Sequence, residues 1–331
     1  MFLLAWGAAG RGADNLLAAP WYVENGVMAV SILTLMALAK LSWDAHYFDG
    51  YDPSTPLNVV VLSEEDREGY HRVYFTYEAY PGNAVPSLMA LPIGTEGPYP
   101  VLVFLHGIGQ SKAFLDEIAP HFANEGFILA TFDQHMQGER KLKDPTFIEQ
   151  GLALRRRGAL TVNEARRMVD YLDTRPDVDK DRIYLIGASY GAVTGATAAA
   201  FEKRFKAVVL TYGGGDLSQL AANEEVIKAV GPLTGYVGRL ASFFGAPFDP
   251  VRYVDGVSPR PILFQNGNRD RIVVPAAAMA LHRAAKEPKE IKWYPSDHLD
   301  LDPDYIHLVI RDGLEWIKAQ DARLVAERAQ K

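Results

Sequence analysis

Ser189 is the residue of this chain whose surroundings most clearly suggest chemistry. The segment Gly187–Gly191 reads GASYG and places the serine between two glycines. A short apolar run, Ile183–Ile186, precedes it, and an Ala-rich run extends from it to Phe201. This pattern predicts a strand, a tight turn and a helix, with the serine at the turn. A serine hydroxyl becomes a useful nucleophile when a nearby base takes its proton, and such a turn lifts the hydroxyl clear of the sheet.

The residues beside the serine fit this interpretation. Gly187 and Gly191 remove side chains that would clash where strand and helix meet, and Ala188 adds little bulk. The backbone N–H of Tyr190 would lie at a helix N-terminus, where an anion is favoured. The G-x-S-x-G pattern resembles the nucleophile elbow of the α/β-hydrolase family. A Gly-rich turn could also merely connect a strand to a helix, so the remaining partners decide between the two interpretations.

Two further residues follow predicted strands in the order that the resemblance implies. Asp270 lies in the turn after a strand at 262–264, and His298 lies in the loop after a strand at 291–294. The family order is Ser, then Asp, then His. The resemblance implies that His298 transfers the proton and that Asp270 orients the imidazole. Asp216, which also follows a strand, is the alternative acid.

A second loop resembles the HG-type oxyanion loop of esterases. The sequence His-Gly-Ile-Gly begins at His106, directly after a predicted buried strand. The resemblance implies that the N–H groups of Ile108 and Tyr190 bind the developing negative charge, and Gly109 stays open as an alternative to Ile108. We interpret His106 as structural. The glycines at 107 and 109 could also belong to a dinucleotide-binding loop, but such a loop needs a third glycine where this chain has Lys112, so we reject that alternative. We expect Lys112 to be solvated.

A third match is the segment 133–140, which reads DQHMQGER. It resembles the D-x-x-x-x-G-E-R turn of prolyl-oligopeptidase-like and dienelactone-hydrolase-like esterases. We interpret it as structural and expect Arg140 to lie against a carboxylate.

The periodicity of the chain predicts elements that could position these residues. Strand patterns alternate with helical ones from residue 100 onward, which predicts a mostly parallel central sheet with helices on both faces, an α/β fold. An antiparallel edge precedes it. Expected strands lie at 59–62, 73–79, 87–91, 101–105, 127–132, 183–186, 207–211, 262–264 and 291–294. Expected helices lie at 113–124, 165–172, 190–201, 276–285 and 306–317.

Two segments fall outside this alternation. Residues 216–259 carry apolar side chains at helical spacing, and Gly231-Pro232 should divide them into two helices. We interpret this segment as a small helical cap over the pocket, because ligands bind outside the carboxyl ends of parallel strands. Residues 1–45 form an N-terminal helical extension, and 46–331 form the catalytic domain with the cap insertion. The apolar run 27–39 is shorter than a membrane span of about 20 residues, so we favour a helix packed on protein over a membrane anchor.

Composition limits the function classes. The chain has 331 residues, a net charge of −7 and no cysteine, which excludes disulfides, a cysteine nucleophile and Cys-ligated metal sites. The sequence contains no basic stretch of the kind that indicates nucleic-acid binding. We predict a carboxylesterase for small to medium acyl esters that needs neither a cofactor nor a metal. We expect a cytoplasmic location, and the sequence leaves open whether the chain forms a homo-oligomer. A serine exopeptidase of the prolyl-oligopeptidase type and a non-catalytic binding protein with the same fold are the alternatives.

Overall fold

The computed structural model describes residues 21–298 and 303–330, so the first 20 residues of the predicted N-terminal extension lie outside it. The chain divides into two compact units, Met1–His46 and Tyr47–Lys331. The described part of the first unit is one helix, α1 (Trp21–Ala45), which extends six residues beyond the predicted apolar run at each end. Its 25 residues correspond to a length of about 37 Å at 1.5 Å per residue.

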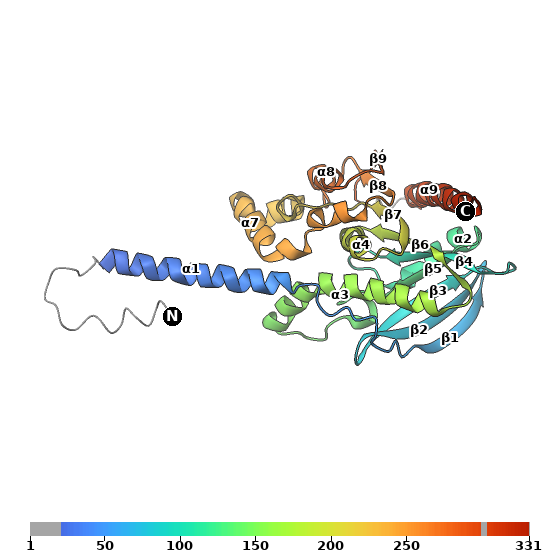
Figure 1. Cartoon of the computed structure of the whole chain (residues 1–331). Helices are drawn as coiled ribbons and strands as arrows, with labels where there is room; N and C mark the ends of the chain where they lie inside the picture. The colour runs from blue at the N-terminus through green and yellow to red at the C-terminus, as the bar shows by residue number, and fades with distance from the viewer. Residues whose placement is uncertain (1–20, 299–302, 331) are drawn as a thin grey trace. The chain divides into compact units, whose positions relative to one another are not determined.

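Within the described residues of the second unit, nine strands form one mixed sheet (Figure 1). The strand order is β1-β2-β3-β5-β4-β6-β7-β8-β9. The strands are β1 (Val60–Arg67), β2 (Tyr70–Tyr80), β3 (Asn83–Leu91), β4 (Tyr99–Leu105), β5 (Ile128–Phe132), β6 (Val178–Ala188), β7 (Phe205–Thr211), β8 (Ile262–Gly267) and β9 (Lys289–Tyr294).

The two parts of the sheet have different patterns, as predicted. Strands β1, β2, β3 and β5 pair antiparallel, and β2 alternates buried and half-buried positions. All pairs among β5, β4, β6, β7, β8 and β9 are parallel, and every residue of β5 and β8 is buried. Parallel strands covered on both faces need such continuous apolar runs.

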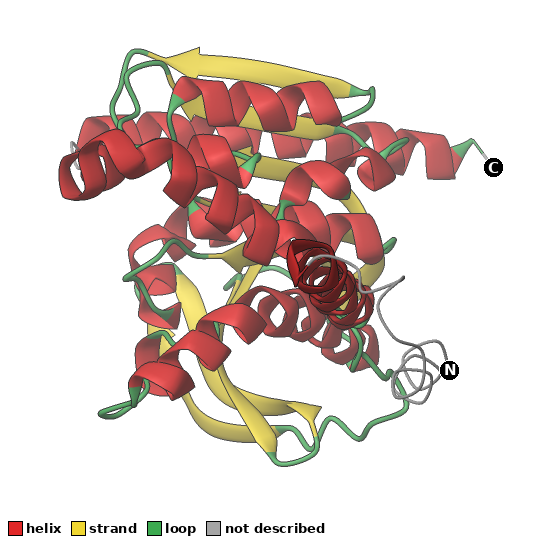
Figure 2. Cartoon of the chain, turned by 90° about the vertical axis from the view of Figure 1, so that its left-hand side faces the viewer, coloured by secondary structure: helices red, strands yellow, loops and turns green. Residues whose placement is uncertain are grey.

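Helices cover both faces of the sheet (Figure 2). One apolar core lies beneath α3, α4 and α8, and a second lies beneath α2 and α9 on the other face. The helices of the second unit include α2 (Leu115–Ala123), α3 (Phe147–Thr174), α4 (Tyr190–Phe201), α8 (Pro275–Ala284) and α9 (Pro303–Ala329). The predicted α/β-hydrolase arrangement is therefore the fold of this unit.

The segment after β7 forms three helices, α5 (Leu217–Leu220), α6 (Glu224–Val230) and α7 (Thr234–Gly245). The chain breaks at Gly231, as expected, where a positive φ of 52° suits glycine and Pro232 prevents continuation. Helix α5 packs against α7 and α8, so the segment belongs to the side of the sheet that carries α8.

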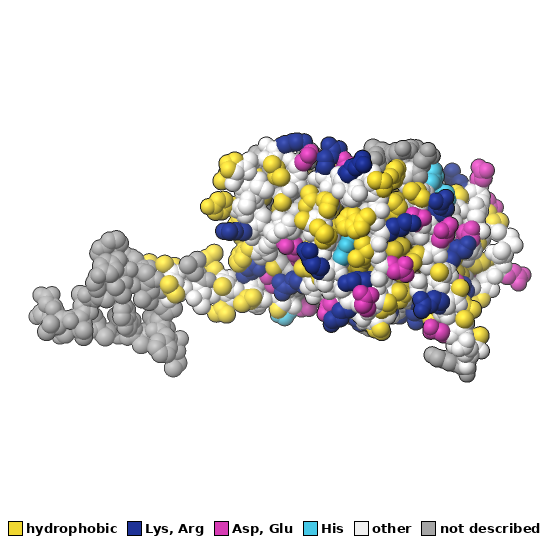
Figure 3. Space-filling model, turned by 90° about the horizontal axis from the view of Figure 1, so that it is seen from above, with side chains coloured by type: hydrophobic (Ala, Val, Ile, Leu, Met, Phe, Trp, Pro, Cys, Tyr) yellow, Lys and Arg dark blue, Asp and Glu magenta, His cyan; other side chains and the backbone are white. Residues whose placement is uncertain are grey.

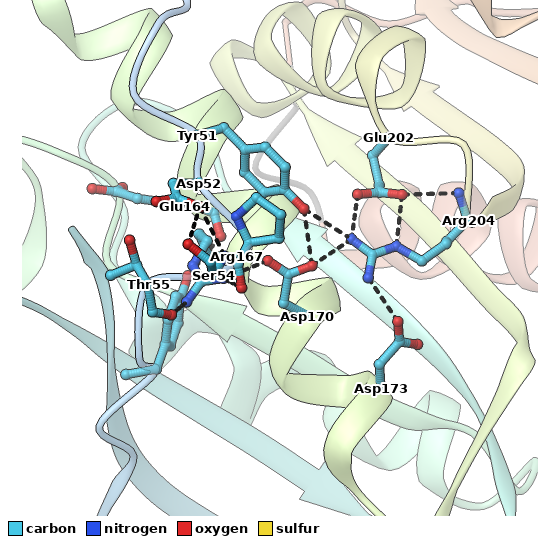
Figure 4. A network of polar contacts seen from close by, with 12 residues as sticks. Tyr51, Asp52, Ser54, Thr55, Glu164, Arg167, Asp170, Asp173, Glu202 and Arg204 are labelled. Carbon is cyan, nitrogen blue, oxygen red and sulfur yellow. Dashed lines mark hydrogen bonds and ion pairs between the residues drawn. The ribbon is translucent and has the colours of Figure 1, made fainter.

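A network of charged groups fastens the start of the second unit to α3 and to the loop before β7 (Figure 4). Arg167 of α3 is almost fully buried, donates to the carbonyl of Pro53 at 3.2 Å and pairs with Asp170 at 2.7 Å. Tyr51 donates to Asp170 at 3.0 Å, and Arg204 pairs with the same carboxylate at 2.7 Å. Because one half-buried carboxylate accepts from three donors, the turn at residues 51–55 is held against α3.

The D-x-x-x-x-G-E-R turn is structural, as interpreted from the sequence. Arg140 forms two hydrogen bonds with the buried carboxylate of Glu164, at 2.7 and 2.8 Å. A Cβ at Gly138 would lie 2.1 Å from the Asp133 carboxylate, which explains the glycine. The expectation of a solvated Lys112 is wrong. Its side chain is buried and pairs with Asp133 at 3.1 Å, because the carboxylate supplies the partner that a buried ammonium needs.

Candidate active site

The nucleophile elbow has the strained geometry that the glycines predict. Strand β6 ends at Ala188, and Ser189 has φ 54° and ψ −117° before α4 begins. A Cβ at Gly187 would lie 2.2 Å from the Gly191 carbonyl oxygen, and a Cβ at Gly191 would lie 1.8 Å from the Leu105 carbonyl oxygen. Only glycine fits at both positions, because the obstacles are backbone atoms. A positive φ at a non-glycine residue is uncommon and costs energy, which the surrounding structure must offset.

The structure brings the three predicted polar residues into one chain of hydrogen bonds. Ser189 Oγ lies 2.9 Å from His298 Nε2, and His298 Nδ1 lies 2.7 Å from Asp270 Oδ2. The other oxygen of the buried Asp270 accepts from the N–H groups of Ile272 at 2.9 Å and Val273 at 2.7 Å. These two bonds fix the carboxylate, so it can orient the imidazole with Nε2 toward the serine.

Neighbouring residues that the motifs did not identify support His298. Asp297 accepts from the backbone N–H of His298 at 2.7 Å. Partial burial works against its charge, but hydrogen bonds from Arg271 and His298 lower the pKa of Asp297 to about 2. The ring of Tyr212 meets the imidazole edge-on at 5.8 Å, and its hydroxyl bonds Ser296 at 2.6 Å. The position of Tyr212 directly after β7, at the edge that carries the serine, is the sequence signal that could have identified it.

The alternative acid, Asp216, has another role. It is the N-cap of α5, and its Oδ1 accepts from the N–H of Ser218 at 3.1 Å. Asp270 therefore contacts the imidazole, and Asp216 does not belong to this hydrogen-bonded chain.

The predicted oxyanion loop distinguishes between its two candidate donors. The N–H of Gly109 donates to Gln137 Oε1 at 2.8 Å, and the N–H of Gly107 donates to Gln110 Oε1 at 2.9 Å. No described residue accepts from the N–H of Ile108 or of Tyr190. These two amides thus stay available for a substrate oxygen, whereas the amide of Gly109 is already engaged.

His106 is a structural residue of this loop. Its side chain is fully buried, and Nδ1 lies 3.0 Å from the Gly107 carbonyl. Burial lowers the pKa of this imidazole, although its hydrogen bond to Gly107 acts in the other direction. The carbonyl of His106 accepts from the buried Gln134 at 2.6 Å, so the loop is held from beneath.

A cavity of about 470 Å³ opens beside the serine and the imidazole. Its described lining comes mainly from β-strand ends, α2 and α9, and it is mostly apolar. Its apolar lining residues include Phe104, Phe114, Ile118, Phe122, Val309 and Ile310. No described residue of 216–259 lines it, so the structure departs from the expected cap over the pocket. The physical reason is that α5–α7 pack toward α8, on the other face of the sheet from α2 and α9.

The polar groups at the floor of the cavity are already satisfied. Thr211 donates to Gln265 Oε1 at 2.9 Å, and Gln265 Nε2 donates to the hydroxyl of Tyr294 at 2.8 Å and the carbonyl of Val309 at 2.9 Å. Such a floor offers few free donors to a ligand and suits an apolar group. In the part of the chain that the structure describes, no three His, Asp or Glu side chains are placed to hold a metal ion.

The sequence pattern of the prolyl oligopeptidase family matches residues 118–320, which is more than half of the chain. The chain belongs to the prolyl oligopeptidase family. Among individual relatives, YtaP of Bacillus subtilis strain 168 is 28% identical over 236 residues, covering 66% of this chain and 76% of YtaP. YfhR of Salmonella typhi is 22% identical over 289 residues, covering 83% of this chain and 87% of YfhR.

Solved structures of this fold are also similar. An acetyl xylan esterase from Paenibacillus sp. R4 matches with a TM-score of 0.66 and 18% identity, over 85% of this chain and 93% of that one. Acetyl xylan esterase 1 from Thermoanaerobacterium sp. matches with a TM-score of 0.61 and 17% identity, over 82% of this chain and 92% of that one. At such identities the likeness shows the fold. Together with the family, it identifies this prolyl oligopeptidase family member as a serine hydrolase with the α/β-hydrolase fold.

Proposed function

We propose that this chain is a carboxylesterase that cleaves small to medium acyl esters through an acyl-enzyme at Ser189. The observation that carries the proposal is the hydrogen-bonded series from Asp270 through His298 to Ser189, which opens onto an apolar cavity. A hydroxyl 2.9 Å from an oriented imidazole is an activated nucleophile.

The first half of the reaction forms the acyl-enzyme. Ser189 Oγ attacks the ester carbonyl carbon while its proton passes to His298 Nε2. The carbonyl oxygen becomes an alkoxide and accepts from the N–H groups of Ile108 and Tyr190. When the tetrahedral intermediate collapses, the C–O bond to the alcohol breaks and His298 returns its proton to the departing oxygen. Asp270 stays ionised and stabilises the imidazolium during both transfers.

The second half regenerates the serine. Water gives a proton to His298 Nε2 and attacks the acyl carbonyl, and the same two amides accept the negative charge. Collapse releases the carboxylic acid and returns the proton to Ser189 Oγ. Losing one oxyanion donor typically costs about 10²–10³-fold in kcat, so the availability of the Ile108 amide matters to the rate.

The cavity supports a modest apolar group as the part of the substrate that is bound. A volume of about 470 Å³ lies within the usual range of ligand pockets, roughly 300–1,000 Å³. Its aromatic and aliphatic lining and the satisfied polar floor favour hydrocarbon over a sugar or a charged group. We therefore expect kcat/KM to rise with acyl length and to fall once the chain exceeds the cavity.

A series of nitrophenyl esters from acetate to laurate tests the proposal, with Ser189→Ala as the control. Wild type should hydrolyse the shorter esters and react with a fluorophosphonate probe, and the variant should do neither. Hydrolysis that survives in Ser189→Ala at the wild-type rate would refute the assigned nucleophile. Absence of probe labelling in folded wild type would instead support the non-catalytic binding protein.

A serine exopeptidase is the alternative within the same family. The described lining of the cavity contains one carboxylate, Glu117, which offers little to bind a peptide amino terminus. Aminoacyl nitroanilides assayed beside the esters separate the two activities. Turnover of the anilides alone would replace the esterase by a peptidase.

A further inference from the structure

Helix α1 has the composition of a membrane span rather than of a surface helix. Its large exposed apolar side chains occur all round the helix and do not form one stripe: Met28, Val30, Ile32, Leu35, Met36, Leu38 and Leu41. A helix that is apolar all round lies either in a protein core or in a bilayer. None of the window Met28–Ala45, which is long and apolar enough to cross a membrane, is buried in the described structure.

The few polar residues of α1 fit a bilayer as well. Lys40 and Asp44, the charged residues of that window, pair with each other one turn apart, near the end of the helix. Paired charges near a helix end are the tolerated kind in a membrane. The sequence places Trp21 and Tyr22 in the first turn and Trp43 in the last. About 32 Å separate these aromatic positions along the axis, close to the roughly 30 Å hydrocarbon core that aromatic residues flank.

The body of the protein exposes a second apolar surface, on α7. Four side chains at helical spacing form what we call the α7 face: Tyr236, Leu240, Phe243 and Phe244. Tyr236, Leu240 and Phe244 are 67%, 56% and 60% exposed. Exposed stripes of this kind mark interaction sites. The only charged residue of α7 is the exposed Arg239, and Figure 3 shows Lys and Arg beside hydrophobic side chains at the end of the body that α7 forms.

The α7 face lies close to the point where the chain enters the body. The guanidinium of Arg155, on α3, lies 5.0 Å from the ring of Tyr47 and donates to the carbonyl of Phe244 at 2.6 Å. Asn163 donates to the carbonyl of Phe48 at 3.1 Å, and the charged network shown in Figure 4 holds the residues that follow. One residue, His46, separates the end of α1 from Tyr47. Along the chain, α1 therefore ends two residues before Tyr47, the residue whose ring Arg155 contacts.

We propose that α1 crosses a lipid bilayer and that the α7 face rests on the surface of the same bilayer. The occupant of the face is a bilayer that contains anionic lipid, because the exposed Arg239 adjoins Leu240 on α7 and α7 has no acidic residue. Aromatic and aliphatic side chains enter the boundary between headgroups and acyl chains, and the arginine contacts phosphate. This inference does not depend on the reaction at Ser189.

The absence of cysteine from the chain permits a direct test. The full chain carrying Tyr236→Cys is labelled with an environment-sensitive fluorophore and reconstituted into phosphatidylcholine–phosphatidylglycerol vesicles. Lipids with a quencher near the headgroup should reduce its fluorescence at least threefold. Val325→Cys is the matched control, since this exposed residue belongs to α9, which Figure 1 shows at the opposite side of the second unit from α7, and its label should keep its fluorescence. If the quencher lipids reduce the fluorescence of both labels equally, or of neither label, the placement of the α7 face on the bilayer is overturned.

A second pair of variants tests the anchor. Leu35→Arg with Leu38→Arg places two charges in the middle of α1, and Leu35→Ile with Leu38→Ile keeps it apolar. Wild type and the Ile variant should float with vesicles and resist a high-salt wash, and the Arg variant should lose at least tenfold of the floated fraction. A cooperative thermal unfolding transition at the wild-type midpoint shows that the catalytic unit of each variant is folded. If wild type does not float but forms a dimer, and the Arg variant is a monomer, then α1 contacts a second copy of the chain and not a bilayer.

Discussion

Replacing Gly191 by alanine tests whether the elbow is as tight as its geometry implies. The added Cβ would lie 1.8 Å from the carbonyl oxygen of Leu105 and 2.4 Å from its carbonyl carbon, where ordinary contact begins at 3.4 Å. Backbone of β4 and the first turn of α4 must therefore separate by about 1.6 Å. Both segments lead to residues of the proposed active site, since Leu105 precedes the loop that begins at His106 and Gly191 lies two residues after Ser189.

The size of the effect follows from that displacement. A misplacement of about 1 Å in an active site can cost 10²-fold in rate, so we expect kcat/KM to fall by about 10²–10³. Overpacking of this kind also lowers the free energy of unfolding by about 1–3 kcal/mol. The assays are initial rates on a nitrophenyl ester and thermal unfolding.

Gly195→Ala is the matched control one turn further along α4. Its Cβ would meet the end of the Leu185 side chain at 2.9 Å, and a flexible side chain can move where backbone cannot. We expect this variant to keep kcat/KM within about threefold of wild type. If Gly191→Ala also stays within that range, the argument that backbone contact dictates the glycine is refuted.

Three further predictions concern the charged and titratable groups. Asp270→Asn should reduce kcat by about 10³–10⁴ while KM stays similar, because the amide no longer stabilises the imidazolium of His298; equal kcat in the two proteins would exclude the assigned role. Glu164→Gln should lower the free energy of unfolding in urea by about 3–5 kcal/mol, because Arg140 then keeps a buried charge without its partner; an unchanged midpoint would contradict this. Burial, with help from nearby cations, lowers the pKa of His282 to about 4. The imidazole of His282 binds a proton more tightly in the unfolded chain than in the folded one. Its contribution to the free energy of unfolding is therefore fully present above pH 6.5 and is lost as the pH falls toward 4, by about 2 kcal/mol at pH 5. Urea unfolding at pH 7 and at pH 5 measures how much the free energy of unfolding falls between the two, and this fall should be smaller in His282→Gln than in wild type. An equal fall in both proteins would assign the pH dependence to other groups.

Local features of the fold could be predicted from the sequence. The alternation of β2, the buried runs of β5 and β8, and the break at Gly231 follow from side-chain period and from glycine and proline chemistry within a few residues. The order of Ser189, Asp270 and His298 along the chain indicated which strand ends must meet. A parallel sheet brings its carboxyl ends to one edge, so spacing along the chain was enough to expect their convergence.

Features that depend on distant partners could not be predicted in this way. Lys112 was expected in solvent, but Asp133, 21 residues further along, provides a buried partner. The segment 216–259 has a clear helical period, yet period alone does not say on which side of the sheet its helices pack.

Sequence by itself thus determined the strand–turn–helix at Ser189, the glycines that it needs and the identity of the residues that could serve it. Tertiary structure decided which amide of the oxyanion loop is available, because the donor of Gly109 is taken by Gln137, 28 residues away in sequence. It also decided that α2 and α9 form the walls of the cavity. The physical reason is that periodicity and turn chemistry act over a few residues, whereas hydrogen-bond satisfaction and burial are set by whichever segments the fold brings together.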